Sequence, residues 1–79
     1  MNSIGDVIVN RLIKFMNEKK LTQYRLAQLS GVPFPTIKSI MQRRTKDITL
    51  KTILMLCTGL QITPSEFFND ESFINIILE

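Results

Sequence analysis

Apolar residues recur every three or four positions along the first part of the chain. They stand at Ile4, Val7, Ile8, Leu12, Phe15 and Met16. This spacing matches the 3.6-residue repeat of an α-helix and gives it one apolar stripe. Arg11, Lys14 and Glu18 fall on the other, polar side of that helix. The pattern therefore predicts an amphipathic helix near residues 5–20.

Three further helix starts share one local sequence, an aliphatic residue followed by threonine. The pairs are Leu21-Thr22, Ile48-Thr49 and Ile62-Thr63. In each pair the threonine hydroxyl can cap the first helical turn, and the aliphatic side chain can pack on an apolar residue five positions later. Those partners are Leu26, Ile53 and Phe67. The last start also has Pro64 in the first turn and Glu66 to complete a capping box.

Together these signals predict an all-α chain without a β-sheet, since no segment alternates with a period of two residues. Helices are expected near residues 5–20, 23–30, 35–43, 50–59 and 64–69, with a sixth short helix between Glu71 and Leu78. Gly31 is expected to end the second helix in a left-handed conformation. A chain of 79 residues, 44% of them hydrophobic, fits one domain over 1–79, with a core of 5–69 and an apolar C-terminal segment of 70–79.

Charge is unevenly distributed along this chain. All ten basic residues lie between Arg11 and Lys51 against two acidic ones, which gives that stretch a formal charge of +8. Residues 52–79 hold four acidic residues and no basic one. A basic body favours an anionic partner such as nucleic acid. An ordinary solvated surface would have the same charge, so charge alone does not decide between them.

Residue types that carry most catalysis and metal binding are scarce. The chain has no histidine and one cysteine, Cys57, which leaves neither a zinc ligand set nor a histidine-activated nucleophile. Cys57 shares the apolar stripe of the predicted helix 50–59 with Leu50, Ile53 and Leu54, which indicates a core residue. We expect that the protein is not an enzyme and that it binds no metal, cofactor or small-molecule ligand.

Neither a secretion signal nor a membrane-spanning segment is expected. Asp6, Asn10 and Arg11 interrupt the apolar N-terminal pattern, and no uncharged apolar stretch approaches the roughly 20 residues that cross a bilayer. The sequence therefore predicts a soluble, intracellular protein.

The two predicted helices 23–30 and 35–43 are joined by a very short connection, Ser30-Gly31-Val32-Pro33. Two short helices joined by a tight glycine turn can hold the second helix against the major groove of DNA. An antiparallel helical hairpin within a bundle would have the same spacing, so both interpretations stay open at this point.

The run Leu21–Val32, with the sequence LTQYRLAQLSGV, resembles the start of the helix-turn-helix in lambda-repressor/Cro-like regulators of the XRE type. The likeness continues at Ile37, Ile40, Ile48-Thr49-Leu50, Thr52-Ile53, Leu60, Ile62-Thr63-Pro64-Ser65 and Phe67-Phe68. It covers about residues 5–69, and it implies a compact five-helix lambda-repressor-like DNA-binding domain with a short extra C-terminal helix. The implied function is a sequence-specific double-stranded DNA-binding transcriptional regulator, a repressor, in the cytoplasm of a prokaryote or encoded by a phage.

The same resemblance assigns a DNA-binding face. Gln23 resembles the family glutamine that clamps a phosphate and braces the recognition helix, here the predicted helix 35–43. The outward positions of that helix are Phe34, Pro35, Thr36, Lys38, Ser39 and Gln42. Thr36 and Ser39 can exchange hydrogen bonds with base edges. Lys38 can contact guanine or a phosphate, or it can be an ordinary solvated lysine. The loop that follows this helix is basic and can either bind DNA phosphates or form a solvated charge cluster. Its residues are Gln42, Arg43, Arg44 and Lys46.

Some positions depart from the family pattern. Pro33 replaces the usual capping residue, and Pro35 disfavours helical geometry at Phe34, so the helix is expected to start one residue late with Phe34 projecting. Phe34 could then contact thymine methyls or the sugar backbone, or else cap the core. Arg43 replaces the glycine that usually ends this helix, so the helix can run on. Tyr24 could reach a phosphate, but partial burial is expected.

The C-terminal segment is dense in large apolar side chains, namely Phe73, Ile74, Ile76, Ile77 and Leu78. Each such side chain left in water forfeits roughly 1.5–3 kcal/mol of burial. The segment should therefore fold back over the first helix or meet a second copy, and we expect a homodimer with recognition helices about 34 Å apart. The alternative function is a protein-interaction module on the same fold, such as an antitoxin or anti-repressor that holds its partner with this segment.

Overall fold

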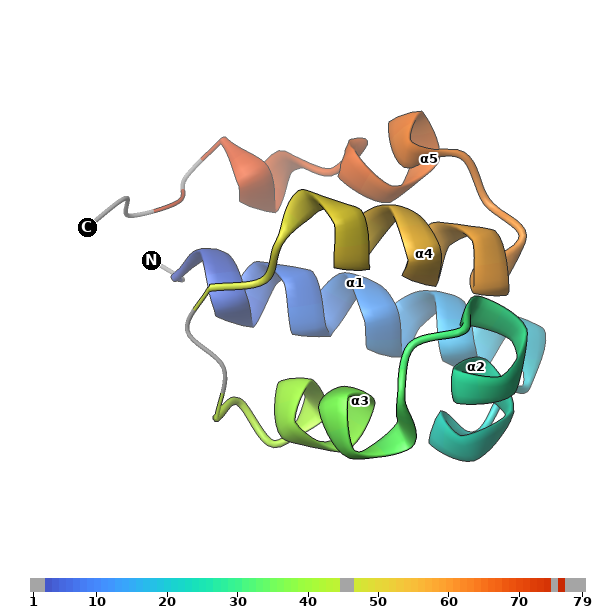
Figure 1. The fold of residues 1–79 in the computed structure, drawn as a ribbon. Helices are drawn as coiled ribbons and strands as arrows, with labels where there is room; N and C mark the ends of the chain where they lie inside the picture. The colour runs from blue at the N-terminus through green and yellow to red at the C-terminus, as the bar shows by residue number, and fades with distance from the viewer. Residues whose placement is uncertain (1–2, 45–46, 75, 77–79) are drawn as a thin grey trace.

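The fold, taken from a computed structural model, is described for residues 3–44, 47–74 and 76. The helices in chain order are α1 (Ile4–Lys19), α2 (Gln23–Ser30), α3 (Phe34–Met41), α4 (Leu50–Leu60), α5 (Pro64–Phe68) and the 3-10 helix η1 (Glu71–Phe73). Figure 1 shows α1 and α4 in the middle, with α2 and α3 below them and α5 and η1 above. The described residues form no β-strand. The predicted all-α fold with five helices is therefore confirmed.

Threonine caps are present at all three predicted helix starts. The hydroxyls of Thr22, Thr49 and Thr63 accept the backbone N–H of the residue three positions later, at 3.0, 3.2 and 3.1 Å. Glu66 completes the predicted capping box, because its carboxylate accepts the N–H of Thr63 at 3.3 Å. These bonds satisfy N–H groups that have no partner within the helix. The three starts are thus encoded locally.

Three helices end at residues other than glycine that adopt the left-handed conformation. These residues are Lys20, Arg43 and Gln61, with φ of 55°, 60° and 59°. In each case the next residue donates its N–H to a carbonyl five positions back, as in a Schellman motif. After α1 and α4 that next residue is Leu21 or Ile62, which also precedes the threonine cap of the following helix. One apolar residue thus closes a helix and opens the next, which keeps both connections short.

The buried stripe of α4 differs from the predicted one. Cys57 is buried as predicted, and its burial raises the pKa of the thiol, which disfavours a reactive thiolate. Leu50 and Leu54 were expected on the same stripe, but both are exposed. The inward positions of α4 are Ile53, Leu56, Cys57, Gly59 and Leu60. Leu54 lies about a third of a turn from the centre of this stripe, and Leu50 is the first residue of the helix.

α2 and α4 approach each other closely at Gly59. A Cβ atom at this position would lie 2.7 Å from the Cβ of Ser30 and 2.9 Å from its N and Cα atoms. Ser30 is the last residue of α2 and directly precedes Gly31. Since only a glycine fits between these backbones, Gly59 sets how closely α2 packs on α4.

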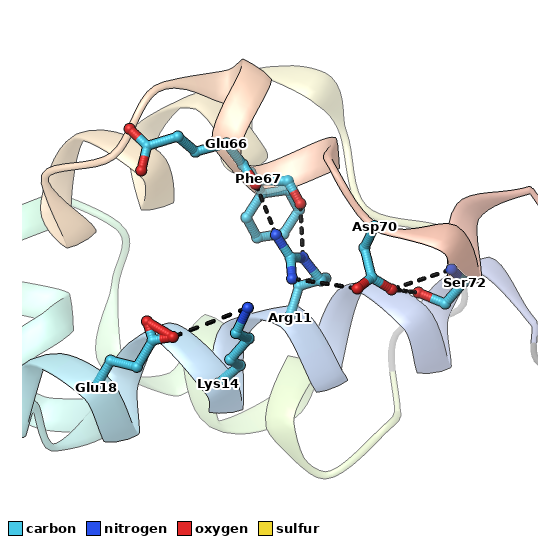
Figure 2. A network of polar contacts seen from close by, with 7 residues as sticks. All are labelled: Arg11, Lys14, Glu18, Glu66, Phe67, Asp70 and Ser72. Atoms are coloured by element: carbon cyan, nitrogen blue, oxygen red, sulfur yellow. Dashed lines mark hydrogen bonds and ion pairs between the residues drawn. The ribbon is translucent and has the colours of Figure 1, made fainter.

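Arg11 is buried, which corrects its predicted place on the polar side of the first helix. Only 5% of this residue is exposed. Its Nε donates to the carbonyl oxygen of Phe67 at 2.8 Å, and its Nη2 donates to that of Glu66 at 2.6 Å (Figure 2). The guanidinium also lies 4.8 Å from the ring centroid of Phe15. Arg11 therefore satisfies the last carbonyls of α5, a role that periodicity along α1 cannot reveal.

Asp70 extends this polar contact at the end of α5. Its carboxylate accepts the hydroxyl and the backbone N–H of Ser72 and lies 3.5 Å from Nη1 of Arg11. The bonds from Ser72, followed by the charge of Arg11, hold the pKa of Asp70 below its usual value. The carboxylate is thus favoured in its charged form, which suits its place beside the guanidinium.

In the C-terminal segment, the predicted short sixth helix begins at Glu71 as expected, but in the described residues it is a single 3-10 turn and not a helix that continues toward residue 78. η1 covers Glu71–Phe73, and Ile74 follows in a turn. Phe73 packs against the core, with its ring centroid 6.3 Å from that of Phe67 and 5.1 Å from that of Phe68. Part of the segment therefore folds back to complete the core, next to α1. None of the described helices has the length and apolar character needed to cross a membrane.

We predict that Gly59→Ala lowers the free energy of unfolding by about 1–3 kcal/mol, since the new Cβ forces α2 and α4 apart. The better helix propensity of alanine would act in the opposite direction, by about 1 kcal/mol. Urea denaturation followed by circular dichroism measures the difference. Thr58→Ala, at the exposed neighbouring position, is the control and should change stability by less than about 0.5 kcal/mol. A Gly59→Ala variant that is more stable than the wild type by about 1 kcal/mol, the gain expected from helix propensity alone, would refute the close packing.

Arg11→Met should destabilise the fold by about 2–4 kcal/mol, because it keeps the aliphatic stem but leaves two carbonyls of α5 without a charged donor. Lys14→Met is the matched control one turn later. Lys14 is exposed and its ion pair with Glu18 spans 3.9 Å, so its loss should cost less than about 0.5 kcal/mol. Thermal and urea unfolding of both variants make the comparison, and similar effects would argue against a structural role for Arg11.

Candidate nucleic-acid interface

The turn between α2 and α3 is closed by local hydrogen bonds. Gly31 ends α2 in the left-handed conformation, with φ of 78°, as predicted, and its N–H donates to the carbonyl of Ala27 at 3.0 Å. The hydroxyl of Ser30 accepts the N–H of Val32 at 3.1 Å, and Val32 is buried. Backbone and side chain thus fix the path of the turn, which fixes where α3 begins.

α3 starts at Phe34, so the expected late start is wrong. The carbonyl of Pro33 accepts the N–H groups of Thr36 and Ile37 at 3.0 and 3.1 Å, which makes Pro33 the N-cap. Phe34 and Pro35 are then the first two helical residues. Pro35 is tolerated there because the first turn needs no N–H at that position. Phe34 is therefore helical despite the restriction that the following proline places on it.

α3 ends at Met41, so the expectation that it runs on to residue 43 is also wrong. Arg43 takes the left-handed conformation in place of the usual glycine, and the N–H of Arg44 donates to the carbonyl of Ser39 at 3.0 Å. A left-handed residue other than glycine costs about 1–2 kcal/mol. The side chain of Arg43 offsets part of this cost by an exposed ion pair of 3.2 Å with Asp6 and a hydrogen bond of 3.4 Å to Asn10. The end of α3 is therefore tied to α1.

The two faces of α3 have opposite character. Ile37 and Ile40 are buried in the core, on the same side as Leu26 and Val32. The residues predicted to face DNA lie on the remaining surface: Phe34, Pro35, Thr36, Lys38 and Gln42 are exposed, and Ser39 is half-buried. The helix thus presents hydroxyl, amide, ammonium and aromatic groups to solvent. These groups can donate to or accept from base edges and phosphates.

Tyr24 belongs to the same surface, which sequence reasoning missed. It was expected to be partly buried, but 61% of the residue is exposed. Its ring meets that of Phe34 edge-on, with centroids 5.9 Å apart and planes at 72°. Tyr24 lies in the first turn of α2 and Phe34 in the first turn of α3, so the short turn brings both helix starts together. An aromatic residue in the first turn of each of two helices joined by a short turn is the sequence feature that could have predicted this pair.

The remaining predicted site residues differ in how exposed they are, and some lie outside the described residues. Gln23, the first residue of α2, is half-buried, and Arg44 is exposed. Lys46 lies outside the described residues. In the C-terminal segment Ile74 is 81% exposed and Ile76 is half-buried, whereas Ile77 and Leu78 also lie outside the described residues. The structure thus brings the predicted α3 residues together and separates Phe73, which is used in the core, from Ile74.

Comparison with known families agrees with this geometry. The model of the Cro/C1-type HTH DNA-binding domain matches residues 11–72, from within α1 to η1. Comparison with curated proteins and with solved structures gave no match. The matched range spans most of the chain and includes both helices of the turn and the surface described above. The chain therefore belongs to the Cro/C1-type helix-turn-helix DNA-binding family.

Proposed function

We propose that the protein is a sequence-specific transcriptional regulator that reads the major groove of double-stranded DNA with α3. The observation that carries this proposal is the division of α3 into a face anchored by Ile37 and Ile40 and an exposed polar face, within a family that binds DNA. Such a helix can enter a groove without losing its own packing. We further propose that it acts as a repressor in the cytoplasm of a prokaryote or phage-infected cell, by occupying its site.

Exposed groups on α3 suit direct reading of bases. The hydroxyl of Thr36 can exchange hydrogen bonds with a base edge, and Ser39 offers a second hydroxyl that is half-buried. Lys38 can donate to the O6 and N7 acceptors of guanine, the most common specific contact for a cationic side chain. These three residues are our candidates for sequence reading.

Phosphate contacts would hold α3 in register along the groove. Three candidates for such contacts lie at the ends of the two helices. Gln23 is at the start of α2, and Gln42 and Arg44 follow the end of α3. Arg43 is paired with Asp6 in the free protein, so a phosphate would have to share or replace that partner. We propose Lys46 as a further contact. Such contacts add affinity that depends on salt but carry little sequence information.

A homodimer would place two copies of α3 on successive faces of the major groove, about 34 Å apart. Support comes from Ile74, a large apolar side chain left 81% exposed at the end of the described C-terminal segment. We propose that Ile74, Ile76, Ile77 and Leu78 contact the second copy, and that Phe73 supports them from within the core. The same exposed residue also favours the alternative, a protein-interaction module that holds a different protein.

Selection from a pool of randomised duplexes at physiological salt should recover a palindrome whose half-sites lie about 10 base pairs apart. On that duplex, Lys38→Ala should weaken binding by about ten- to one-hundred-fold, the loss expected for one base contact. Lys14→Ala removes the same charge from the side of α1 next to Arg11 and should change the Kd less than about twofold. Equal losses in both variants, or no enriched sequence, would contradict reading by α3.

Ile74→Asp should shift the protein toward monomer without lowering its melting temperature, because the side chain makes little contact within its own subunit. Analytical ultracentrifugation, with and without the selected duplex, measures the shift. Phe73→Ala is the contrasting variant and should lower the melting temperature, because Phe73 packs on Phe67 and Phe68. A wild-type protein that sediments as a monomer both free and on DNA would refute the homodimer.

A further inference from the structure

The six aromatic residues of the chain divide into two groups. Phe15, Phe68 and Phe73 surround Phe67, with ring centroids 5.2 to 6.4 Å from it. Phe15 and Phe67 are buried in the core, Phe73 packs against it, and Phe68 is 39% exposed at its edge. The remaining two, Tyr24 and Phe34, pair with each other at the starts of α2 and α3. Tyr24 is 61% exposed and Phe34 38% exposed, so this pair leaves apolar ring surface in solvent that a partner can cover.

We infer that Phe34, held edge-on by Tyr24, reads the C5 methyl group of a pyrimidine in the major groove. The base pairs preferred at this position would carry thymine or 5-methylcytosine, rather than uracil or unmethylated cytosine. This inference rests on the proposed function, because it needs the N-terminal part of α3 to lie in the groove. It adds to that function the kind of DNA site that the protein prefers, namely one with a 5-methylated pyrimidine at a fixed position.

The position and chemistry of Phe34 support this assignment. As the first residue of α3, Phe34 lies at the end of the helix that reaches base edges in this kind of docking. Its benzyl group neither donates nor accepts hydrogen bonds, so it cannot distinguish amino from carbonyl edges. The C5 methyl is the apolar group that the major groove offers. An apolar side chain at this place can therefore read sequence only through that methyl.

Packing around Phe34 argues against insertion between bases. Wedging side chains of this kind act mainly from the minor groove, where they unstack a base step. Phe34 is 38% exposed, so most of its surface is already covered, and Tyr24 holds the ring from one side. Pro33 and Pro35 restrict the backbone on both sides. A ring held in this way can contact a methyl group at the edge of a base pair, but it has little surface left to enter the stack.

Tyr24 has a positioning role in this arrangement. Its edge-to-face contact at 5.9 Å favours one orientation of the Phe34 ring over others. Fixing the ring before binding reduces the loss of rotamer freedom on the DNA. Tyr24→Leu should therefore reduce the preference for the methyl group without abolishing binding.

Replacing each thymine of the selected duplex by deoxyuridine, one at a time, tests the inference because only the methyl group is removed. One thymine in each half-site should be sensitive, with a Kd about three- to five-fold weaker, as expected for one buried methyl group. A C·G pair at that position should bind more weakly than T·A, and 5-methylcytosine should recover part of the loss. Fluorescence anisotropy with labelled duplexes measures each Kd.

Phe34→Ala should bind the thymine and deoxyuridine duplexes equally well. Phe68→Ala is the matched control, since Phe68 is also a phenylalanine with 39% exposure but lies on α5 against Phe73. Phe68→Ala should keep the full ratio between the Kd for the deoxyuridine duplex and the Kd for the thymine duplex. Should Phe34→Ala fail to bind at all, Phe34→Leu decides, because a smaller apolar side chain without the ring should lower the ratio. Melting curves establish that each variant is folded.

Two results would overturn the inference and leave the proposed function intact: a specific site at which no thymine is sensitive to loss of its methyl, or a ratio that survives in Phe34→Ala. The second result would assign the methyl contact to another residue of α3, such as Thr36. An unchanged ratio in Tyr24→Leu would remove Tyr24 from the proposal. A selection that enriches no sequence would overturn the proposed function and the inference together.

Discussion

The position of the helix-turn-helix depends on the close contact between Gly59 of α4 and Ser30 of α2. At 2.7 Å from the Cβ of Ser30, a side chain atom at position 59 has no room. Ser30 in turn accepts the N–H of Val32, the buried residue that follows the left-handed Gly31. A displacement of α2 from α4 would therefore move the whole turn, and with it the start of α3. One missing side chain in α4 thus sets the place of the surface proposed to meet DNA.

The other end of α3 is held by a different kind of contact. There the bonds to the carbonyls of Ser39 and Ile40 stop the helix, and Arg43 pairs with Asp6 and Asn10 of α1. Both ends of α3 are thus fixed before any ligand binds, which lowers the entropy lost on binding. The ion pair is exposed and is therefore weakened by salt. Asp6 would also compete with the DNA phosphate that we propose as a partner of Arg43, so the contact that holds this end of α3 would weaken the attraction of Arg43 to DNA.

Features that depend on neighbouring residues were predictable from the sequence, and features that depend on distant ones were not. The caps at Thr22, Thr49 and Thr63 and the left-handed Gly31 follow from contacts within a few positions. The exposed residues of α3 followed from helical periodicity and the family resemblance. Arg11 did not, because it binds carbonyls 55 and 56 positions away, and a guanidinium on a helix is ordinarily solvated. The early end of α3 was missed for a similar reason, since the partners of Arg43 lie in α1.

Arg11 also decides what the C-terminal segment can do. By binding the last carbonyls of α5 and pairing with Asp70, it fixes where the chain turns back toward α1. The turn at Asp70 and Ser72 then places Phe73 against Phe67 and Phe68, where it is needed to cover the core. Ile74 comes next and is left in solvent. Among the described residues, Phe73 therefore completes the core, and Ile74 is the exposed apolar residue that we propose to contact a second copy. The polar contact between Arg11 and the end of α5 helps to place both residues.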